Sequence, residues 1–311
     1  MALKYYLPEK KESNLIQLFK KYVFRVEPVP EVPYHIQIQT TTYCNGRCVF
    51  CPYMDTSKKL PHGNMDMDLF KKIVDECLEF GIKHIRPYLM NEPLCDKTLP
   101  EKIKYLSLKK TDDFVVKINT NASLLDEEMG RRLIEAQLDR INVSFHGSTK
   151  EIYEKCMNGL VYEKVLSNIE NFLKLKEKMG SSKPHVKITM VKTKNIADKI
   201  PEIKQFWVER GLKVNIRPMT NRLNKRIESL DLNVNDWDTF TWCKRLNEQA
   251  YVLYNGDMIL CCNDWLRTTI MGNLREHTIK EIWNNEKYYK IRKQFLSGNV
   301  DGLICKACLM T

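Results

Sequence analysis

The sequence has no long apolar segment, few glycines and prolines, and no targeting signal at its start. No apolar run reaches the roughly 20 residues that a transmembrane helix needs, and the opening MALKYYLPEKKESN lacks the apolar core of a signal peptide. Glycine and proline each occur only 12 times in 311 residues, while 43% of residues are apolar and 29% are charged. This composition predicts a cytoplasmic globular protein with one large α/β domain and a small second one.

A nucleic-acid-binding motif is also missing, although the net charge is +11. Such a charge could serve nucleic acid, anionic lipid, or an acidic substrate or peptide. The lysines are spread over many segments rather than gathered in one stripe. We therefore interpret most of them as solvent-facing charges and expect neither nucleic acid nor membrane as a partner. Eleven cysteines in a cytoplasmic chain indicate metal or redox chemistry rather than disulfides.

A fourth cysteine is missing beside the motif TTTYCNGRCVFCPY at residues 40–53, which contains Cys44, Cys48 and Cys51. A four-iron four-sulfur cluster is normally held by four cysteine thiolates. Three thiolates without a fourth therefore predict a cluster with one iron left open for a small ligand. Zinc is the alternative, but structural zinc sites favour paired cysteines or histidines and a closed four-ligand shell, which this spacing does not provide.

Strand and helix patterns alternate from His35 onward, which is typical of a parallel sheet with right-handed crossovers. Strands are predicted near residues 35–41, 84–90, 115–121, 140–146, 185–191 and 213–218. Helices are predicted near residues 67–80, 98–109, 126–137, 149–156, 162–179 and 198–210. Six β/α units are too few to close an eight-stranded barrel. We divide the chain into an N-terminal arm at 1–33, a partial barrel at 34–221 and a C-terminal domain at 222–311.

Each predicted strand has an apolar face and a polar face. The polar positions are Gln37, Gln39, Thr41, Lys117, Asn119, Asn121, Asn142, Ser144, His146, Lys187, Thr189, Asn215 and Arg217. Because side chains alternate along a strand, these residues line one surface, which predicts the wet lumen of a half-open barrel. The alternative is an amphipathic sheet with a solvent-exposed face. Chemistry in α/β barrels lies at the C-terminal ends of strands, and the cysteine triplet follows the first strand.

The alternation stops after Asn221, and a second cysteine-bearing region follows. It contains Cys243, the pair Cys261-Cys262, and the closing Cys305-Lys306-Ala307-Cys308. The segment Asn255-Gly256-Asp257 lies between the apolar stretches AYVLY and MILCC, and therefore predicts a hairpin turn.

The triplet, with the aromatic Phe50 before its third cysteine, resembles the signature of radical S-adenosylmethionine (SAM) enzymes. The resemblance implies a partial (β/α)6 barrel and a [4Fe–4S] cluster whose open iron binds SAM. It further implies reductive cleavage of SAM to a 5′-deoxyadenosyl radical that removes a hydrogen atom from a substrate, under anaerobic conditions. An electron donor of the flavodoxin or ferredoxin type is implied as a partner.

The segment Met90-Asn91-Glu92-Pro93 resembles the family's GGEP segment, which implies that Asn91 and Glu92 bind the amino group of SAM. The leading pair here is Met-Asn instead of Gly-Gly. Asparagine tolerates positive φ better than most non-glycine residues, so the loop geometry is expected to survive. The alternative is that Glu92 is a surface acid.

Further SAM contacts are implied by the same resemblance. Asn119-Thr120-Asn121 is similar to the family's TN segment at the end of the third strand, so Asn119 and Asn121 are assigned to the cofactor. Phe50 and Val191 are placed near the adenine. Ser144 is placed near the ribose or the carboxylate. His146 is either a substrate contact or a structural histidine.

The C-terminal region resembles the SPASM domain, or its shortened twitch form, which houses auxiliary clusters. The resemblance implies one auxiliary cluster with the four ligands Cys243, Cys261, Cys305 and Cys308. Four thiolates make a closed cluster, suited to moving electrons or supporting structure. Zinc is weighed more seriously here because four cysteines ending in CxxC would suit it. The ligand spacing is similar to that of 2-deoxy-scyllo-inosamine dehydrogenase-like enzymes.

We expect oxidation or epimerisation at a hydroxylated carbon of a sugar- or cyclitol-like substrate. Lys117 or Lys187 would act as the base, and Arg217 would stabilise an alkoxide because a guanidinium stays protonated. Cys95 or Cys156 could return a hydrogen atom to a substrate radical. Cys77 is expected in the core, and Cys262 beside a ligand as a bystander.

Two other functions stay open at this point. One is a maturase that modifies a ribosomally made peptide, which the basic surface favours, while the short segment before the first strand argues against a peptide-recognition domain. The other is a non-enzymatic two-cluster electron carrier or a degenerate binding protein, which would not need the contacts assigned to Glu92 and Ser144.

Overall fold

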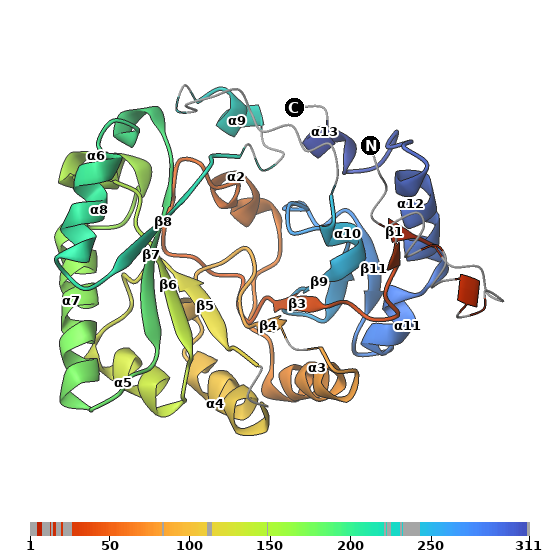
Figure 1. Cartoon of the computed structure of the whole chain (residues 1–311), viewed down its shortest axis with the longest axis horizontal. Coiled ribbons are helices and arrows are strands. Elements are labelled where there is room, and N and C mark those ends of the chain that lie inside the picture. Colours follow the sequence, from red (N-terminus) through yellow and green to blue (C-terminus); the bar gives the residue numbers. More distant parts are fainter. Residues whose placement is uncertain are drawn as a thin grey trace.

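The fold is a partial barrel of parallel strands joined edge to edge to a smaller C-terminal sheet (Figure 1). The computed structural model describes residues 5–7, 13, 15–16, 20, 27–82, 84–110, 114–147, 149–220, 222, 225–230, 232 and 243–309. Most of the expected N-terminal arm and the expected domain boundary at residue 221 lie outside these residues. None of the helices within them is both long and apolar enough to cross a membrane.

The six predicted barrel strands are present in the predicted order. They are β3 (His35–Ile38), β4 (His84–Arg86), β5 (Lys117–Thr120), β6 (Arg140–Ser144), β7 (His185–Val191) and β8 (Lys213–Arg217). Strands β5, β6, β7 and β8 form one parallel sheet, and β3 pairs in parallel with β4. Strands β4 and β5 lie next to each other but belong to different hydrogen-bonded sheets.

The second strand is shorter than predicted. It was expected to run over residues 84–90 but ends at Arg86. The next residue is Pro87, which has no N–H to donate to a neighbouring strand. Strand β4 therefore ends directly before a residue that cannot donate a backbone hydrogen bond.

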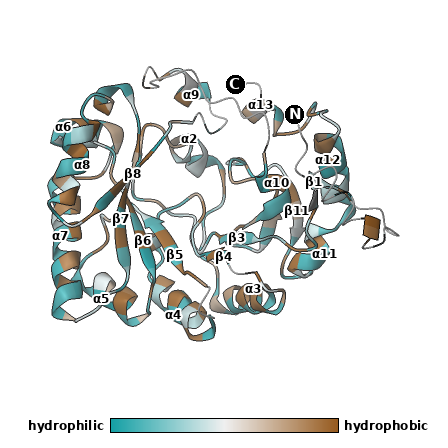
Figure 2. Ribbon diagram, viewed as in Figure 1, coloured by the Kyte–Doolittle hydropathy of each residue, from teal (hydrophilic) through white to brown (hydrophobic). Residues whose placement is uncertain are grey.

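Helices cover the outer side of the barrel strands (Figure 1). They are α3 (Met67–Glu79), α4 (Leu99–Lys109), α5 (Glu127–Glu135), α6 (Lys150–Cys156), α7 (Tyr162–Lys178) and α8 (Ile200–Val208). The apolar strand positions, such as Ile118, Val143 and Ile188, are fully buried against them. The polar positions of β5 and β6 are only partly buried, so hydropathy alternates along the strands as predicted (Figure 2).

The C-terminal region extends the barrel sheet, which the sequence did not predict. Its strands are β9 (Gln249–Val252), β10 (Asp257–Ile259) and β11 (Ile270–Asn273). Strand β9 pairs in parallel with β3, with His35 opposite Gln249, and the sheet order is β11-β10-β9-β3-β4. The predicted hairpin turn is confirmed, because β9 and β10 are antiparallel and Gly256 has a φ of 97°, which favours glycine.

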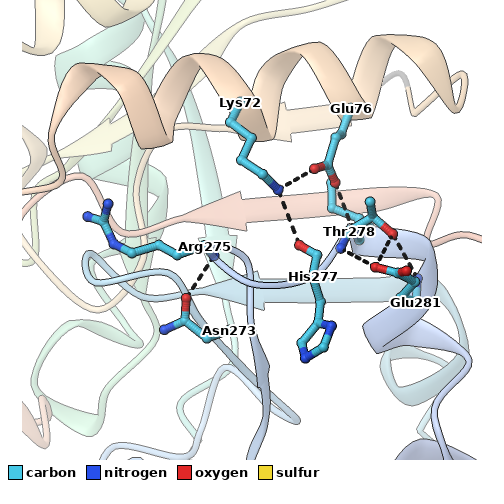
Figure 3. A network of polar contacts seen from close by, with 8 residues as sticks. Lys72, Glu76, Asn273, Arg275, His277, Thr278 and Glu281 are labelled. Carbon is cyan, nitrogen blue, oxygen red and sulfur yellow. Dashed lines mark hydrogen bonds and ion pairs between the residues drawn. The ribbon is translucent and has the colours of Figure 1, made fainter.

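Polar contacts attach the C-terminal helices to the barrel (Figure 3). These helices are α10 (Arg245–Glu248), α11 (Ile279–Trp283), α12 (Glu286–Leu296) and α13 (Lys306–Leu309). The Ile279 N–H at the start of α11 donates to Glu76 of α3 at 2.8 Å, and Lys72 of α3 donates to the His277 carbonyl at 3.2 Å. Thr278 and Glu281 form a capping box at the same helix end. The two cysteine regions are therefore held on one continuous framework.

Candidate active site

The cysteine triplet lies in the loop between β3 and the short helix α2 (Tyr53–Thr56). The loop is pinned by the neighbouring barrel loops, because Val49 N–H donates to the Cys156 carbonyl at 3.0 Å. Asn45 donates to Ser123 at 2.7 Å and accepts from Asn121 at 3.0 Å. The end of the first barrel strand, where chemistry was predicted, is therefore the place where these loops meet.

The three cysteines of the triplet are partly buried and lie close to one another. Burial and, to a smaller extent, the neighbouring Cys51 raise the pKa of Cys48 to about 12. Burial likewise raises the pKa of Cys44, with contributions from Glu92 and both other thiols. Thiolates crowded in this way need a compensating cation, and metal coordination deprotonates a thiol outright. The chemistry of this donor set therefore fits an iron–sulfur cluster.

In the described ranges of the chain, no three His, Cys, Asp or Glu side chains are placed so that they could hold one metal ion. This holds for the triplet and for the C-terminal cysteines alike, since all of them are described.

Glu92 lies buried beside the triplet and is held by the end of β5. Its carboxylate accepts from the Thr120 hydroxyl at 2.5 Å, the Asn121 N–H at 2.7 Å and the Leu94 N–H at 3.1 Å. Burial raises the pKa of Glu92 to about 7, against the lowering effect of these three donors. An ionised carboxylate offers about four acceptor positions, so about one is left for a ligand. Glu92 is thus a buried acid and not a surface one.

Unpartnered polar atoms surround the same loop. Among the described residues, the buried Asn91 Nδ2, Gln39 Oε1 and Thr40 Oγ1 have no hydrogen-bond partner. Buried polar atoms are normally paired, so three orphaned atoms beside the triplet fit a polar ligand such as SAM. Asn91 was expected to tolerate a positive φ, but Asn91 does not have a positive φ in the structure. Met90 is the residue with a φ of 55°, while Asn91 Oδ1 accepts from the Leu89 N–H at 2.9 Å.

The residues assigned to the adenine are brought together by His146. Phe50 packs edge-on against the His146 ring with centroids 4.9 Å apart, and the Val191 N–H donates to His146 Nδ1 at 3.0 Å. Burial lowers the pKa of His146 to about 3, with a smaller effect from Arg222. Of the two readings of His146, the structure favours a neutral structural histidine.

The other predicted site residues on the barrel strands share one face. Asn119, Ser144, Lys117, Lys187 and Arg217 all lie on the polar face of the barrel strands. The Asn142 side chain donates to Asn119 at 2.9 Å across β6 and β5. The lumen therefore holds a row of amides and cations.

The two proposed hydrogen-donor cysteines differ in burial. Cys95 is partly exposed, and its sulfur accepts from the Asn45 N–H near the triplet. Cys156 is only 3% exposed and belongs to the apolar core. Cys77 is fully buried in that core, as predicted.

The second cysteine set gathers around the end of β10 and helix α13. Burial raises the pKa of Cys305 to about 12, with contributions from Cys243 and Cys308. Asn263 contacts both Cys261, through its N–H at 3.3 Å, and Cys308, through its amide at 3.8 Å. These contacts place the four predicted ligands together.

Two residues near this set were missed by sequence reasoning. Cys262 was expected to be a bystander, but Arg245 donates to its sulfur at 3.4 Å and the thiol is partly buried beside Cys261. Arg222 lies close enough to act on the pKa of Cys48, Cys51 and Cys262. It therefore lies between the two cysteine sets. The run Arg222-Leu-Asn-Lys-Arg226 carries no motif that could have indicated this.

A cavity of about 850 Å³ opens between the two cysteine sets. Its lining includes Thr56 at the end of α2, Arg222, Asp264 and Ile304. The cavity borders the cysteine triplet on one side and the C-terminal module on the other, and it is distinct from the strand-lined lumen.

Comparisons with known proteins agree with this geometry. A family model described as "Radical SAM superfamily" matches residues 38–204, and one described as an "Iron-sulfur cluster-binding domain", SPASM, matches residues 243–309. The chain is 22% identical to the "Tungsten-containing aldehyde ferredoxin oxidoreductase cofactor-modifying protein" of Pyrococcus furiosus, covering 88% of this chain and 86% of that protein.

Two further similarities cover most of the chain. The "S-adenosyl-L-methionine-dependent 2-deoxy-scyllo-inosamine dehydrogenase" of Niallia circulans is 24% identical, covering 88% of this chain and 91% of that protein. The crystal structure of Streptococcus suis SuiB bound to precursor peptide SuiA superposes with a TM-score of 0.67 at 15% identity, covering 92% of this chain and 74% of that one. The latter similarity concerns the fold alone.

Proposed function

Since the chain belongs to the radical SAM superfamily, we propose that it removes a hydrogen atom from a polar small molecule in the barrel lumen. The outcome would be oxidation or epimerisation at a hydroxylated carbon of a sugar- or cyclitol-like substrate. The observation that carries this proposal is the set of orphaned polar atoms and the buried Glu92 beside the three partly buried cysteines of the triplet. When bound, the cluster and SAM supply the 5′-deoxyadenosyl radical.

The residues around the triplet would bind SAM. Cys44, Cys48 and Cys51 would hold the cluster, and the free acceptor position of Glu92 would receive the ammonium group. The orphaned Asn91 amide donor suits the carboxylate, since it lies on the loop that carries Glu92. Phe50 and Val191 would contact the adenine through the apolar surface that His146 holds in place.

The lumen residues would assist the loss of the hydroxyl proton. Burial lowers the pKa of Lys117 to about 8, with contributions from Arg86, Arg140, Arg217 and Lys187. A lysine with that pKa is partly neutral near neutral pH and can act as a general base. Arg217 would stabilise the alkoxide through the N–H donors of its guanidinium group.

The C-terminal module would accept the second electron of an oxidation. Its four cysteines leave no position for an exogenous ligand, which suits electron transfer. In an epimerisation a thiol would instead return a hydrogen atom, and Cys95 is the better placed of the two candidates because Cys156 is enclosed in the core. The donor of the first electron would be a cytoplasmic flavodoxin or ferredoxin.

A peptide-modifying maturase is the second candidate. The structural similarity to SuiB bound to its precursor peptide favours it at the level of fold. The relative named as a 2-deoxy-scyllo-inosamine dehydrogenase favours the small-molecule alternative. A peptide substrate would need a binding surface that reaches the lumen from outside.

Deuterium transfer tests the proposed function. The protein is purified and reconstituted without oxygen, and then given SAM, dithionite and deuterated candidate substrates. Label entering 5′-deoxyadenosine from a sugar, a cyclitol or a sugar phosphate supports the small-molecule proposal. Label from a leader-bearing peptide alone supports the maturase. Intact SAM after incubation with dithionite would contradict both and leave an electron carrier.

A further inference from the structure

The barrel lumen is lined by cations from neighbouring strands. Strands β4 to β8 lie side by side in Figure 1, and each of them places at least one arginine or lysine on its polar face. Five of these residues are Arg86, Lys117, Arg140, Lys187 and Arg217, and Lys213 at the start of β8 is a sixth cation on the same face. Because the strands curve around the lumen, side chains on this face converge rather than spread apart.

Carboxylates are missing from the same face. The strand residues that share it are His84, Asn119, Asn142, Ser144, His185, Thr189, Val191, Lys213 and Asn215. None of the five cations forms an ion pair with any carboxylate in the part of the chain that the structure describes. The amide oxygen of Asn215 accepts a hydrogen bond from Arg217 Nε at 3.0 Å. Because an amide is neutral, this contact does not compensate the charge of Arg217.

Asp139, which lies next to these strands, already forms ion pairs with two lysines outside the lumen. Asp139 precedes Arg140 in the sequence, but its carboxylate pairs with Lys110 at 2.7 Å and with Lys183 at 2.6 Å. It also accepts from the Val116 N–H at 2.8 Å. Asp139 is thus engaged by lysines beside the lumen, and no acid among the described residues pairs with the five cations inside it.

The pKa of Lys117 reports the resulting field. Burial and the four other cations together lower it to about 8. Charges on a solvated outer surface are screened over about 10 Å and disturb one another little. The shift therefore reflects the burial of Lys117 itself and the proximity of the four other cations, of which Arg140, Lys187 and Arg217 are exposed to solvent.

We propose that the substrate carries at least two negative charges, as phosphate or carboxylate groups, and that Arg86, Arg140, Lys187 and Arg217 bind them. This inference rests on the proposed function, because it takes the lumen as the substrate site. Guanidinium groups bind the oxygen pairs of phosphate and carboxylate in bidentate fashion. A substrate with an ammonium group would be repelled by the same residues, so this lumen disfavours an aminated cyclitol.

Calorimetric titration of the anoxically reconstituted protein tests the proposal. The probes are inorganic pyrophosphate, tricarballylate and the uncharged polyol myo-inositol. We expect at least one anion to bind at least about tenfold more tightly than the polyol. Tighter binding of pyrophosphate indicates a phosphorylated substrate, and tighter binding of tricarballylate a polycarboxylate. Equal binding of all three probes would overturn the proposal.

Paired variants locate the binding. The double variant Arg86→Gln/Arg140→Gln should bind the preferred anion at least about tenfold more weakly. The matched control Lys164→Gln/Lys174→Gln removes the same charge from the exposed side of α7 and should bind it within about twofold of the wild type. An equal loss in both variants would overturn the proposal, because it would show an effect of net charge alone.

Two further measurements keep the result interpretable. The double variant Arg86→Lys/Arg140→Lys retains the charges and should recover most of the affinity, which a folding defect would not allow. SAM cleavage by the wild-type protein with dithionite and no anion tests the proposed function separately. Failure of that reaction with intact anion binding contradicts the enzyme, whereas SAM cleavage without anion preference contradicts only this inference.

Discussion

The two cysteine regions differ in what they leave open. The triplet after β3 provides three thiols, and next to it lie Glu92 and the orphaned atoms of Gln39, Thr40 and Asn91. The C-terminal region provides four thiols, and a fifth, Cys262, is already engaged by Arg245. The first region is incomplete without an outside ligand, and the second is complete in its sulfur donors.

This difference assigns the chemistry. An iron without a protein donor can bind SAM, whereas a cluster with four thiolates can only exchange electrons or hold structure. In the lumen, the five cations form no ion pair with a carboxylate among the described residues, whereas hydrogen bonds of Lys72 and Glu76 join α3 to the start of α11 in Figure 3.

Removing one thiol from each region should have the largest effect. Cys48→Ser should lower SAM cleavage by about a thousandfold or more, because it destroys the cluster that binds SAM. Cys305→Ser should leave SAM cleavage within about threefold of the wild type and abolish substrate oxidation only. Iron content should fall from about eight to about four atoms per chain in both variants.

The control for this pair is Cys77→Ala, a core cysteine remote from both sets. It should keep all the iron and both activities. If Cys305→Ser abolished SAM cleavage as completely as Cys48→Ser, the two regions would not be functionally distinct.

The next largest effect is expected on the pH dependence of substrate oxidation, which should depend on Lys117. The protonated amine cannot accept a proton, so kcat/KM for oxidation should rise about tenfold per pH unit up to about pH 8 and then level off. Lys117→Gln should lower kcat by about 10² or more and remove this dependence. Lys187→Gln should keep it.

The pH dependence of kcat/KM reports the pKa of Lys117 in the free enzyme, and that of kcat reports its pKa in the enzyme–substrate complex. A bound anion would raise the pKa of Lys117, so the rise in kcat should occur at a higher pH than the rise in kcat/KM. Coincident profiles would argue against an anionic substrate, and a flat profile in the wild type against Lys117 as the base.

Glu92 should have a smaller effect, on SAM affinity. Glu92→Gln removes the charge that pairs with the ammonium group and should weaken SAM binding by about 30-fold. Thr120→Val deletes a donor that lowers the Glu92 pKa. It should therefore weaken binding near pH 7 and restore it above about pH 8, where the carboxylate is ionised again. Equilibrium dialysis against labelled SAM measures both, and unchanged affinity in Glu92→Gln would assign this residue to loop structure alone.

The smallest effect is expected at the contact between the regions. Glu76→Ala removes the acceptor of the Ile279 N–H and the partner of Lys72, which should lower the free energy of unfolding by about 1–2 kcal/mol. Glu286→Ala breaks only an exposed pair with Lys290 and should cost less than about 0.5 kcal/mol. Thermal unfolding compares the two. Equal shifts would mean that this contact does not couple the regions.

Periodicity in the sequence was sufficient to predict much of this architecture. Ile118 alternates with Asn119, and Val143 alternates with Ser144. This alternation specified which face of each strand packs against the helices, because a shift of one residue would move every side chain of the strand to the opposite face. The spacing of Cys44, Cys48 and Cys51 specified a three-thiol site, because three cysteines within eight residues lie close together in space. The turn at Gly256 needed only three residues to be recognised.

Long-range pairing could not be predicted in this way. The parallel pairing of β9 with β3 joins residues more than 200 positions apart, and nothing within β9 states which edge it will meet. The end of β4 depended on one proline, and the positive φ fell on Met90 because Asn91 was occupied with the Leu89 N–H. Arg222 carries no local signature, yet it lies between the two cysteine sets.

The sequence by itself determined the element types, the two cysteine sets and the polar face of the strands, because these depend on neighbours within a few residues. Only the tertiary structure decided which groups stay unpaired. The need of Glu92 for a cation, the missing partners of Gln39 and Asn91, and the uncompensated lumen charges arise when distant segments meet and leave no complementary group. Pairing is a property of three-dimensional proximity, and a linear order of residues does not contain it.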